Sequence, residues 1–149
     1  MQLEQEIKQE KFKTEEEKLT VNLIFTYYWL LDRLKDRLRP YGISMQQYNV
    51  LRILRGQGEK PASINLLKER MLDKSSDASR LVERLRIKGL VDRIICPMDR
   101  RAVEIRISNK GLELLTNIDK EDLKSKEIFE SLKPEGVRKL NDLLDELRD

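Results

Sequence analysis

Residues 75–107 read SSDASRLVERLRIKGLVDRIICPMDRRAVEIRI, and the spacing of their apolar side chains changes midway. The first half has the i, i+3, i+4, i+7 spacing of an amphipathic helix, on Ala78, Leu81, Val82 and Leu85. This spacing predicts a helix that runs from Ser75, as its N-cap, to Lys88. In the second half apolar and polar residues alternate, which is typical of strands. We therefore expect a β-hairpin with strands over 90–96 and 102–107 and a turn between them.

Further helices are predicted on both sides of this segment, from apolar periodicity and from capping residues. They cover about 15–38, the stretch after the capping box Ser44-Met45-Gln46-Gln47, about 64–71, the stretch after Ser108, and the stretch from Pro134 onward. The predicted fold class is therefore mainly α, with one hairpin between the fourth and fifth of these helices.

Two short helices joined by a tight turn and followed at once by an arginine-tipped hairpin indicate a winged helix-turn-helix. An α-helix fits the major groove of B-DNA, where its serine and arginine side chains reach base edges or phosphates. A narrow hairpin tip can enter the adjacent minor groove. The candidate DNA contacts are Ser75, Ser76, Ser79, Arg80 and Arg84 on the helix, where Glu83 shares their face, and Arg100 and Arg101 at the tip.

Charge is distributed unevenly along the 149 residues. Residues 39–107 carry 15 basic and 8 acidic side chains, a net charge of +7, whereas the two flanking parts together carry −4. A basic middle between acidic ends predicts a central module that binds a polyanion, with flanking helices of another role. The whole chain is 38% charged and 39% hydrophobic with a net charge of only +3, so a folded protein is expected.

Several kinds of chemistry lack the residues that they need. The sequence has no histidine and one cysteine, Cys96, which excludes histidine-dependent catalytic triads, an internal disulfide and the usual zinc sites. We predict no catalytic residue, no metal site and no cofactor, and hence no enzyme. The longest apolar stretch, 21–31, is shorter than the ~20 residues of a membrane span. Because the acidic start does not resemble a signal peptide, a cytoplasmic protein is expected.

Four segments of the chain carry a resemblance to a known family. They are 72–85 (LDKSSDASRLVERL), 88–91 (KGLV), 99–103 (DRRAV) and 108–111 (SNKG). In this order and spacing they resemble the multiple-antibiotic-resistance regulator (MarR) family, over about residues 15–149.

The resemblance implies an architecture and a function. It implies one domain over 1–149, with a winged helix-turn-helix lobe at 44–107 and dimerisation helices at 15–38 and 108–149. It also implies a homodimeric regulator of transcription, usually a repressor, that a small phenolic or lipophilic ligand or oxidation releases from DNA.

The family's wing pattern, aspartate followed by any residue and then arginine, maps onto Asp99 and Arg101. The resemblance implies that Arg101 enters the minor groove, that Asp99 orients it, and that Arg100 makes an extra backbone contact. The chain departs from the family at the last helix, where Lys133 replaces a serine or threonine cap and Gly136 replaces a glutamate. It also lacks the early cysteine of the peroxide-sensing branch and the histidines of the metal-sensing branch.

Aromatic side chains gather between residues 25 and 48, and two interpretations stay open for them. Aromatic residues at helical spacing usually fill a core. In the family, however, ligands bind between the dimerisation helices and the DNA-binding lobe, and the candidates to line that junction are Tyr27, Tyr28, Trp29 and Tyr48. An apolar cleft with phenolic hydroxyls suits a small aromatic or lipophilic acid, whose carboxylate Arg33 or Arg52 would pair.

Simpler interpretations stand beside these assignments. Arg80 and Arg84 can be solvated charges, Ser75 can act only as a cap, and Cys96 is expected to be a small buried residue, with redox sensing as the alternative. The preferred hypothesis is a homodimer that binds a pseudo-palindromic operator in double-stranded DNA. The alternatives are a winged-helix protein that binds DNA without an effector and a helical adaptor for an acidic protein. The operator, the effector and the sign of regulation do not follow from the sequence.

Overall fold

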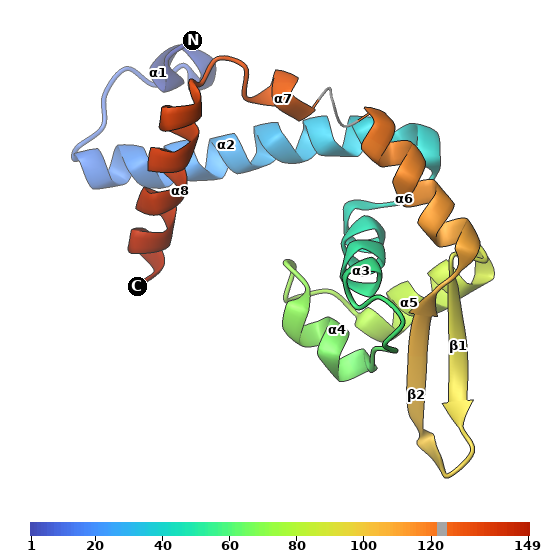
Figure 1. Ribbon diagram of the computed structural model, residues 1–149. Helices are drawn as coiled ribbons and strands as arrows, with labels where there is room; N and C mark the ends of the chain where they lie inside the picture. Colours follow the sequence, from blue (N-terminus) through green and yellow to red (C-terminus); the bar gives the residue numbers. More distant parts are fainter. Residues whose placement is uncertain (122–124) are drawn as a thin grey trace. The chain divides into compact units, whose positions relative to one another are not determined.

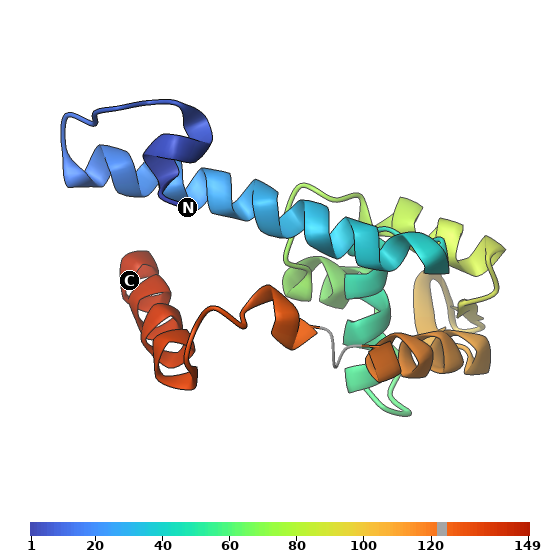
Figure 2. The ribbon, with the colours of Figure 1, turned by 90° about the horizontal axis from the view of Figure 1, so that it is seen from above.

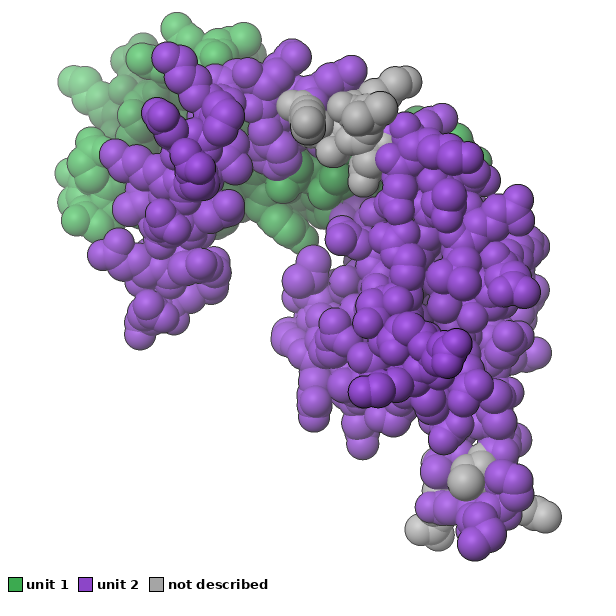
Figure 3. Space-filling model, in the orientation of Figure 1, with its two compact units in different colours: residues 1–40 green, residues 41–149 purple. Residues whose placement is uncertain are grey.

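The computed structural model describes residues 1–121 and 125–149 and, within these ranges, every side chain except those of Cys96, Arg100, Arg101, Ser125 and Lys126. The chain forms two compact units, residues 1–40 and residues 41–149, which Figure 3 shows in different colours. The boundary between them falls within a short 3-10 helix, η1 (Arg39–Tyr41).

The first unit is built on one long helix. Helix α2 (Glu15–Leu38) confirms the helix predicted at 15–38. The hydroxyl of Thr14 caps it by accepting a hydrogen bond from the backbone N–H of Glu17 at 3.1 Å. Three glutamates in its first turn and two basic residues in its last turn complement the helix dipole.

A short helix, α1 (Leu3–Ile7), precedes α2, and the polar start of the sequence gives no sign of it. The side chain of Leu3 is buried, and Glu4 forms an ion pair with Lys18 of α2. Helix α1 therefore depends on contacts with α2, which local periodicity does not reveal.

The second unit contains the remaining elements. They are α3 (Met45–Gly56), α4 (Ile64–Arg70), α5 (Ala78–Ile87), β1 (Val91–Cys96), β2 (Asp99–Ile107), α6 (Asn109–Glu121), α7 (Ser125–Ile128) and α8 (Pro134–Arg148). Helices α3, α4 and α5 lie together beside the base of the hairpin, whose tip projects away from them (Figure 1), and Figure 2 shows the same group from above. The predicted winged helix-turn-helix fold is confirmed.

The core of the second unit lies between α3, α4, α5, α6 and the base of the hairpin. The predicted inward face of α3 is confirmed, since Val50, Leu51, Ile53 and Leu54 are all buried. The predicted capping box is also present: the hydroxyl of Ser44 accepts from the N–H of Gln47 at 3.1 Å, and the Gln47 side chain accepts from the N–H of Ser44 at 3.0 Å. The other buried apolar residues of this unit are Ile43, Ala62, Leu67, Met71, Ala78, Val82, Leu85, Leu90, Val91, Ile105, Leu115 and Ile118.

The start of α6 packs very closely against the base of the hairpin. A Cβ atom at Gly111 would lie 2.3 Å from the carbonyl oxygen of Leu90 and 2.7 Å from Cγ1 of Ile107, so only glycine fits. The hydroxyl of Ser108 accepts a hydrogen bond from the N–H of Gly111 at 3.0 Å and donates one to the carbonyl of Gly89 at 2.7 Å. The predicted Ser108 cap is confirmed, and it also joins the start of α6 to the turn that follows α5.

Strands β1 and β2 form an antiparallel hairpin with one irregularity near its tip. The register shifts just before Cys96, which places Cys96 opposite Asp99. Strand β2 therefore begins at Asp99, and the predicted start at Ala102 is wrong, because the pair of Cys96 and Asp99 extends the ladder beyond the irregularity, where apolar residues no longer alternate. At the base, Ala62 and Ile105 exchange two backbone hydrogen bonds of 2.9 Å, which attach the segment before α4 to β2.

The last helix, α8, has no buried side chain. It begins at Pro134 as predicted, and Lys133 provides no side-chain cap, as its departure from the family pattern indicates. Leu140, Leu143 and Leu147 are 45%, 52% and 57% exposed, so the apolar stripe of α8 is uncovered within the chain. Helix α7 has no counterpart among the predicted elements. No helix in the described ranges is long and apolar enough to cross a membrane.

Candidate nucleic-acid interface

The predicted N-cap of the recognition helix is wrong. Helix α5 begins at Ala78, and its cap is Asp77, whose carboxylate accepts a hydrogen bond from the backbone N–H of Arg80 at 3.1 Å. Ser75 lies in the preceding turn, where its N–H and its hydroxyl both donate to Oδ1 of Asp73, at 3.0 and 2.6 Å. The Asx turn formed by Asp73 occupies the serine hydroxyl, and an aspartate caps a helix as well as a serine does.

The N-terminus of α5 therefore carries the protein's own carboxylates. Hydrogen bonds from the hydroxyl and N–H of Ser75, and from Gln46, lower the pKa of Asp73 and keep it charged at neutral pH. Asp77 already occupies the positive end of the helix dipole, which would otherwise attract a DNA phosphate. DNA contact by Ser75 stays a prediction that these carboxylates oppose, and contact by half-buried Ser76 stays one too.

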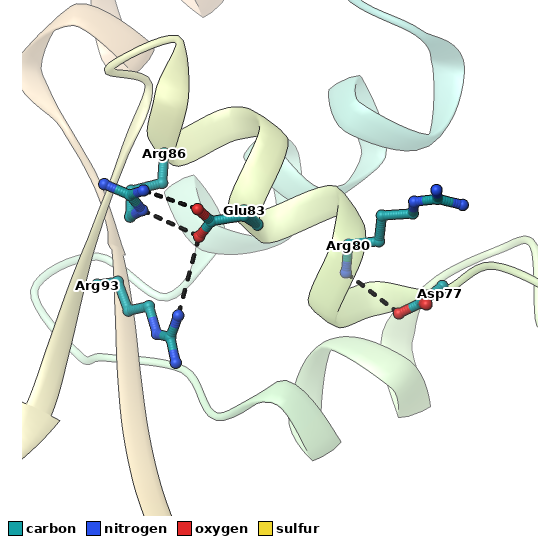
Figure 4. Close-up of polar contacts among 5 residues, drawn as sticks. All are labelled: Asp77, Arg80, Glu83, Arg86 and Arg93. Carbon is teal, nitrogen blue, oxygen red and sulfur yellow. Dashed lines mark hydrogen bonds and ion pairs between the residues drawn. The ribbon is translucent and has the colours of Figure 1, made fainter.

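The outer face of α5 presents the predicted contacts. Ser79, Arg80 and Arg84 are exposed, whereas Ala78 and Val82 point into the core. Among the described residues, none pairs with the guanidinium of Arg80 or of Arg84. In Figure 4 the side chain of Arg80 extends away from Glu83 and Arg86. The donors of these two arginines are therefore free to bind phosphates or the O6 and N7 atoms of guanine.

The C-terminal end of α5 is anchored by two lysines. The ammonium of Lys110, from α6, donates to the carbonyl of Lys88 at 2.9 Å, which satisfies a carbonyl that the helix leaves free. The Lys88 ammonium in turn donates to the carbonyl of Gly42 and to the side chain of Gln47 at the start of α3. The face of α5 is thus held in a fixed orientation on the lobe, as base readout requires.

Glu83, which the periodicity places on the same face as Arg80 and Arg84, pairs with neither of them. It lies between α5 and the hairpin and accepts two hydrogen bonds from Arg86, at 3.0 and 2.7 Å (Figure 4). Nη1 of Arg93, from β1, lies 3.8 Å from the same carboxylate. The hydrogen bonds from Arg86, together with the charges of Arg86 and Arg93, lower the pKa of Glu83.

Arg86 and Arg93 were not among the predicted site residues. The i, i+3 spacing of Glu83 and Arg86 on one helix was an available signal for their pairing. The approach of Arg93 was not, because it depends on how the hairpin packs against α5.

The wing is described in part. Asp99 is the first residue of β2, opposite Cys96, and Met98 beside it is 95% exposed at the tip. The side chains of Arg100, Arg101 and Cys96 lie outside the described part of the chain. The proposed pairing of Asp99 with Arg101, the minor-groove contacts and the redox role of Cys96 therefore stay predictions.

The predicted ligand-pocket residues fall in both units. In the first unit, Tyr27 and Tyr28 are 58% and 59% exposed and pack edge to face with 5.3 Å between ring centroids. The guanidinium of Arg33 stacks 3.8 Å from the ring centroid of Trp29. In the second unit, the guanidinium of Arg52 lies 5.7 Å from the ring centroid of Tyr48. Each half of the predicted pocket thus has a cation beside an aromatic ring.

Cavities within the units overlap little with this set. A cavity of about 300 Å³ in the first unit includes Trp29 among its lining residues, which are Met1, Leu3, Glu6, Asn22, Phe25, Thr26 and Trp29. A groove of about 600 Å³ in the second unit includes none of the predicted residues, and its lining is Tyr41, Ile87, Lys88, Leu90, Lys110, Glu113, Leu114 and Asn117. The described residues contain no cluster of acidic and cysteine side chains that is placed to hold a metal ion.

Known proteins share this sequence and geometry. A model of the MarR family matches residues 41–102. The HTH-type transcriptional repressor IacR of Pseudomonas putida is 28% identical over 132 residues, which cover 81% of this chain and 76% of that protein. A MarR-like transcription regulator from Bacillus cereus has a TM-score of 0.78 at 25% identity, over 90% of this chain and 96% of the other. A MarR mutant from E. coli in complex with operator DNA has a TM-score of 0.75 at 25% identity, over 93% and 99%.

The family match spans α3, α4, α5, β1 and the first residues of β2, which include most of the candidate interface. The resemblance inferred from the sequence is confirmed by family, relatives and fold together. Residues 41–102 match the MarR family, and the chain is similar in sequence and fold to winged helix-turn-helix transcription regulators of that family.

Proposed function

We propose that this regulator binds a pseudo-palindromic operator in double-stranded DNA as a homodimer and represses transcription from it. The observation that carries the proposal is the exposed face of α5, where Arg80 and Arg84 have no partner among the described residues. The relative from E. coli binds operator DNA, and the relative from P. putida is a repressor. As in its family, the activity is binding and release without catalysis. We place it in the cytoplasm, with the DNA.

In this proposal α5 lies in the major groove and the wing reaches the neighbouring minor groove. Arg80 reads base edges, while Arg84, Ser76 and Ser79 bind phosphates or bases at the rim of the groove. At the wing, Arg101 enters the minor groove, oriented by Asp99, and Arg100 contacts the backbone. Ser75 contributes to the interface by its place in the turn before α5, where it is bonded to Asp73, and not by capping the helix.

The proposed organisation is one domain with two kinds of part. Residues 44–107 bind DNA, and residues 15–38 and 108–149 dimerise. The uncovered stripe of α8 supports this role, because an exposed row of leucines marks a surface that a partner covers. A two-fold axis would place the two recognition helices about one DNA turn apart, ~34 Å or a multiple of it.

We further propose that a small aromatic or lipophilic acid releases the dimer from DNA. Its binding residues would be Tyr27, Tyr28, Trp29 and Tyr48, with Arg33 or Arg52 pairing its carboxylate. The exposure of both tyrosines in α2 argues against the core interpretation for them. The ligand must bind more tightly to the dimer whose two recognition helices are spaced so that they do not fit DNA. The difference between its affinities for this state and for the DNA-binding state sets how far it weakens DNA binding.

A selection of duplexes from a randomised pool tests the DNA-binding function. The pool uses duplexes of ~30 base pairs, about three helical turns, at ~150 mM salt, where weak electrostatic binding is reduced. We expect an inverted repeat to be enriched and bound at least 100-fold more tightly than a scrambled duplex. Equal binding of both duplexes would instead favour the helical adaptor, since any basic face binds DNA at low salt.

Fluorescence of Trp29, the only tryptophan, tests the effector. Salicylate and decanoate should change the emission and weaken binding to the selected duplex over the same concentration range. A change in emission with constant DNA affinity would mean that the ligand site does not regulate. If neither signal moves and Tyr28→Ala only lowers stability, the protein binds DNA without an effector of this kind.

A further inference from the structure

The arginines of the recognition helix differ in their partners. Arg80 and Arg84 have none among the described residues, whereas Arg86 is held by two hydrogen bonds to the carboxylate of Glu83. A bidentate pair fixes the orientation of the guanidinium as well as its position. Arg86 is therefore kept beside Glu83, in a set place on the flank of α5.

The same carboxylate also holds an arginine of the wing. Arg93 projects from β1 and lies 3.8 Å from Oε2 of Glu83, the oxygen that also accepts from Nε of Arg86 (Figure 4). One acidic group thus contacts two cations, one from the element expected in the major groove and one from the wing.

This cluster lies on the accessible surface. The side chains of Glu83, Arg86 and Arg93 are 43%, 47% and 44% exposed. Exposed ion pairs contribute little to stability, because water screens them and ordering the side chains opposes them. Since DNA phosphates can reach the same surface, the effect of Glu83 is expected in binding more than in folding.

We propose that Glu83 sets the selectivity of the protein for its operator by withholding Arg86 and Arg93 from DNA phosphates and by fixing the wing relative to α5. The inference rests on the DNA binding proposed above. A phosphate that binds either arginine must compete with Glu83. On DNA other than the operator, no base contacts make up for this competition, so Glu83 weakens non-specific binding.

On the operator the balance differs. The base contacts of α5 and the wing fix one register, and the link between Glu83 and Arg93 helps to hold the wing where that register needs it. Freeing the arginines therefore adds phosphate contacts on any DNA. It also loosens the placement of the wing relative to α5, which strengthens binding only on the operator. Each additional neutralised phosphate steepens the salt dependence by ~0.9, which corresponds to about 5-fold in affinity at ~150 mM salt.

The test compares Glu83→Gln with Glu113→Gln. Both variants remove one negative charge from the same unit, and Glu113, on α6, forms no ion pair with any described residue. Affinities are measured for the inverted-repeat duplex selected with the wild-type protein and for its scrambled version, over a series of salt concentrations. Thermal unfolding of each variant is recorded alongside. Both variants should fold normally, because a glutamine side chain keeps the shape of the glutamate that it replaces.

We expect Glu83→Gln to bind the scrambled duplex about 5-fold more tightly or better, with a salt slope steeper by ~1–2. Its affinity for the selected duplex should stay about the same, because the added phosphate contacts and the loosened wing offset each other, so selectivity falls by about 5-fold. Adding Arg93→Gln to Glu83→Gln should remove about half of the gain on the scrambled duplex. The Glu113→Gln variant should keep wild-type selectivity.

Two results would overturn the inference. If Glu83→Gln matches Glu113→Gln on both duplexes, or if it tightens both equally, Glu83 does not set selectivity although the protein still reads its operator. If the wild-type protein itself does not discriminate between the duplexes, the proposed DNA-binding function fails first and the role of Glu83 fails with it.

Discussion

The winged-helix lobe and the terminal helices bury their apolar side chains in opposite ways. In the lobe, Leu51, Leu67 and Leu85 are fully buried by residues of the same chain. In α8 none of the residues is buried, and in α2 Leu38 alone is. A lobe that completes its own core can fix the orientation of side chains that read DNA. Helices that leave their leucines uncovered need a partner to become stable, which links their packing to assembly.

The two regions also differ in charge. The lobe lies within the basic stretch of residues 39–107, net +7, while the ends together carry −4. The net negative charge of the ends repels DNA phosphates, whereas the net positive charge of residues 39–107 attracts them. The charges therefore favour DNA binding by the basic region and leave the acidic regions for assembly. The predictions below test whether the two regions can be separated by mutation.

The largest expected effect is the loss of the lobe's core. Leu67→Ala should lower the free energy of unfolding by about 2–5 kcal/mol, because Leu67 is fully buried and leaves a cavity. Leu72→Ala, at a leucine that is 83% exposed in the next turn, should change it by less than ~0.5 kcal/mol. Urea unfolding followed by circular dichroism measures both. Equal effects would mean that the lobe does not depend on its own core.

The second effect separates assembly from folding. The double variant Leu140→Glu and Leu147→Glu should dissociate the proposed dimer and weaken binding to the selected duplex by about 100-fold, since each lobe then binds one half-site alone. The thermal unfolding of the lobe should change little. Sedimentation velocity and DNA titration measure the two properties.

Arg138→Glu is the control on the same helix, because it makes the same change in net charge as the double variant. We expect it to leave the dimer intact, since Arg138 lies about 160° around the helix from Leu140. A monomer that still binds the selected duplex with full affinity would contradict the division into an assembling region and a DNA-binding region.

The same contrast explains which features the sequence could predict. Helix α2, the capping box at Ser44 and the Ser108 cap follow from local patterns, and all are present. The start of α5 was predicted too early because two candidates for the cap, Ser75 and Asp77, stand close together. The choice between them depends on Asp73, which takes the serine hydroxyl.

The sequence could predict which side chains of α5 lie on its exposed face, but not which residues they pair with. Periodicity places Arg80 and Arg84 opposite the core, and they are exposed there. The same periodicity puts Glu83 on that face, but its carboxylate contacts Arg93 of the hairpin, 10 positions along the chain. Such a contact depends on tertiary packing, as does the short helix α1 with its buried Leu3. The proposed assembly of the ends would depend on a second chain, so no single periodic segment could reveal it.

A smaller effect should distinguish base contact from phosphate contact within the lobe. Arg80→Ala should cost about 1–3 kcal/mol on the selected duplex and much less on the scrambled one, as expected for a base contact. Fluorescence anisotropy at fixed salt measures both affinities. An equal loss on both would make Arg80 a phosphate contact, and no loss on either would remove it from the interface.

The smallest effect concerns the wing, and it compares two residues of opposite charge. Arg101→Ala should weaken binding by about 1 kcal/mol, mainly to duplexes whose flanks have a narrow, A·T-rich minor groove, where the negative potential is strongest. Asp99→Ala should cause part of the same loss although it removes a negative charge, because the proposed role of Asp99 is to orient Arg101. Charge counting alone predicts the opposite sign, namely tighter binding by Asp99→Ala on every duplex. Measuring both variants on A·T-rich and G·C-rich flanks therefore decides between an oriented arginine and a wing that acts only through its net charge.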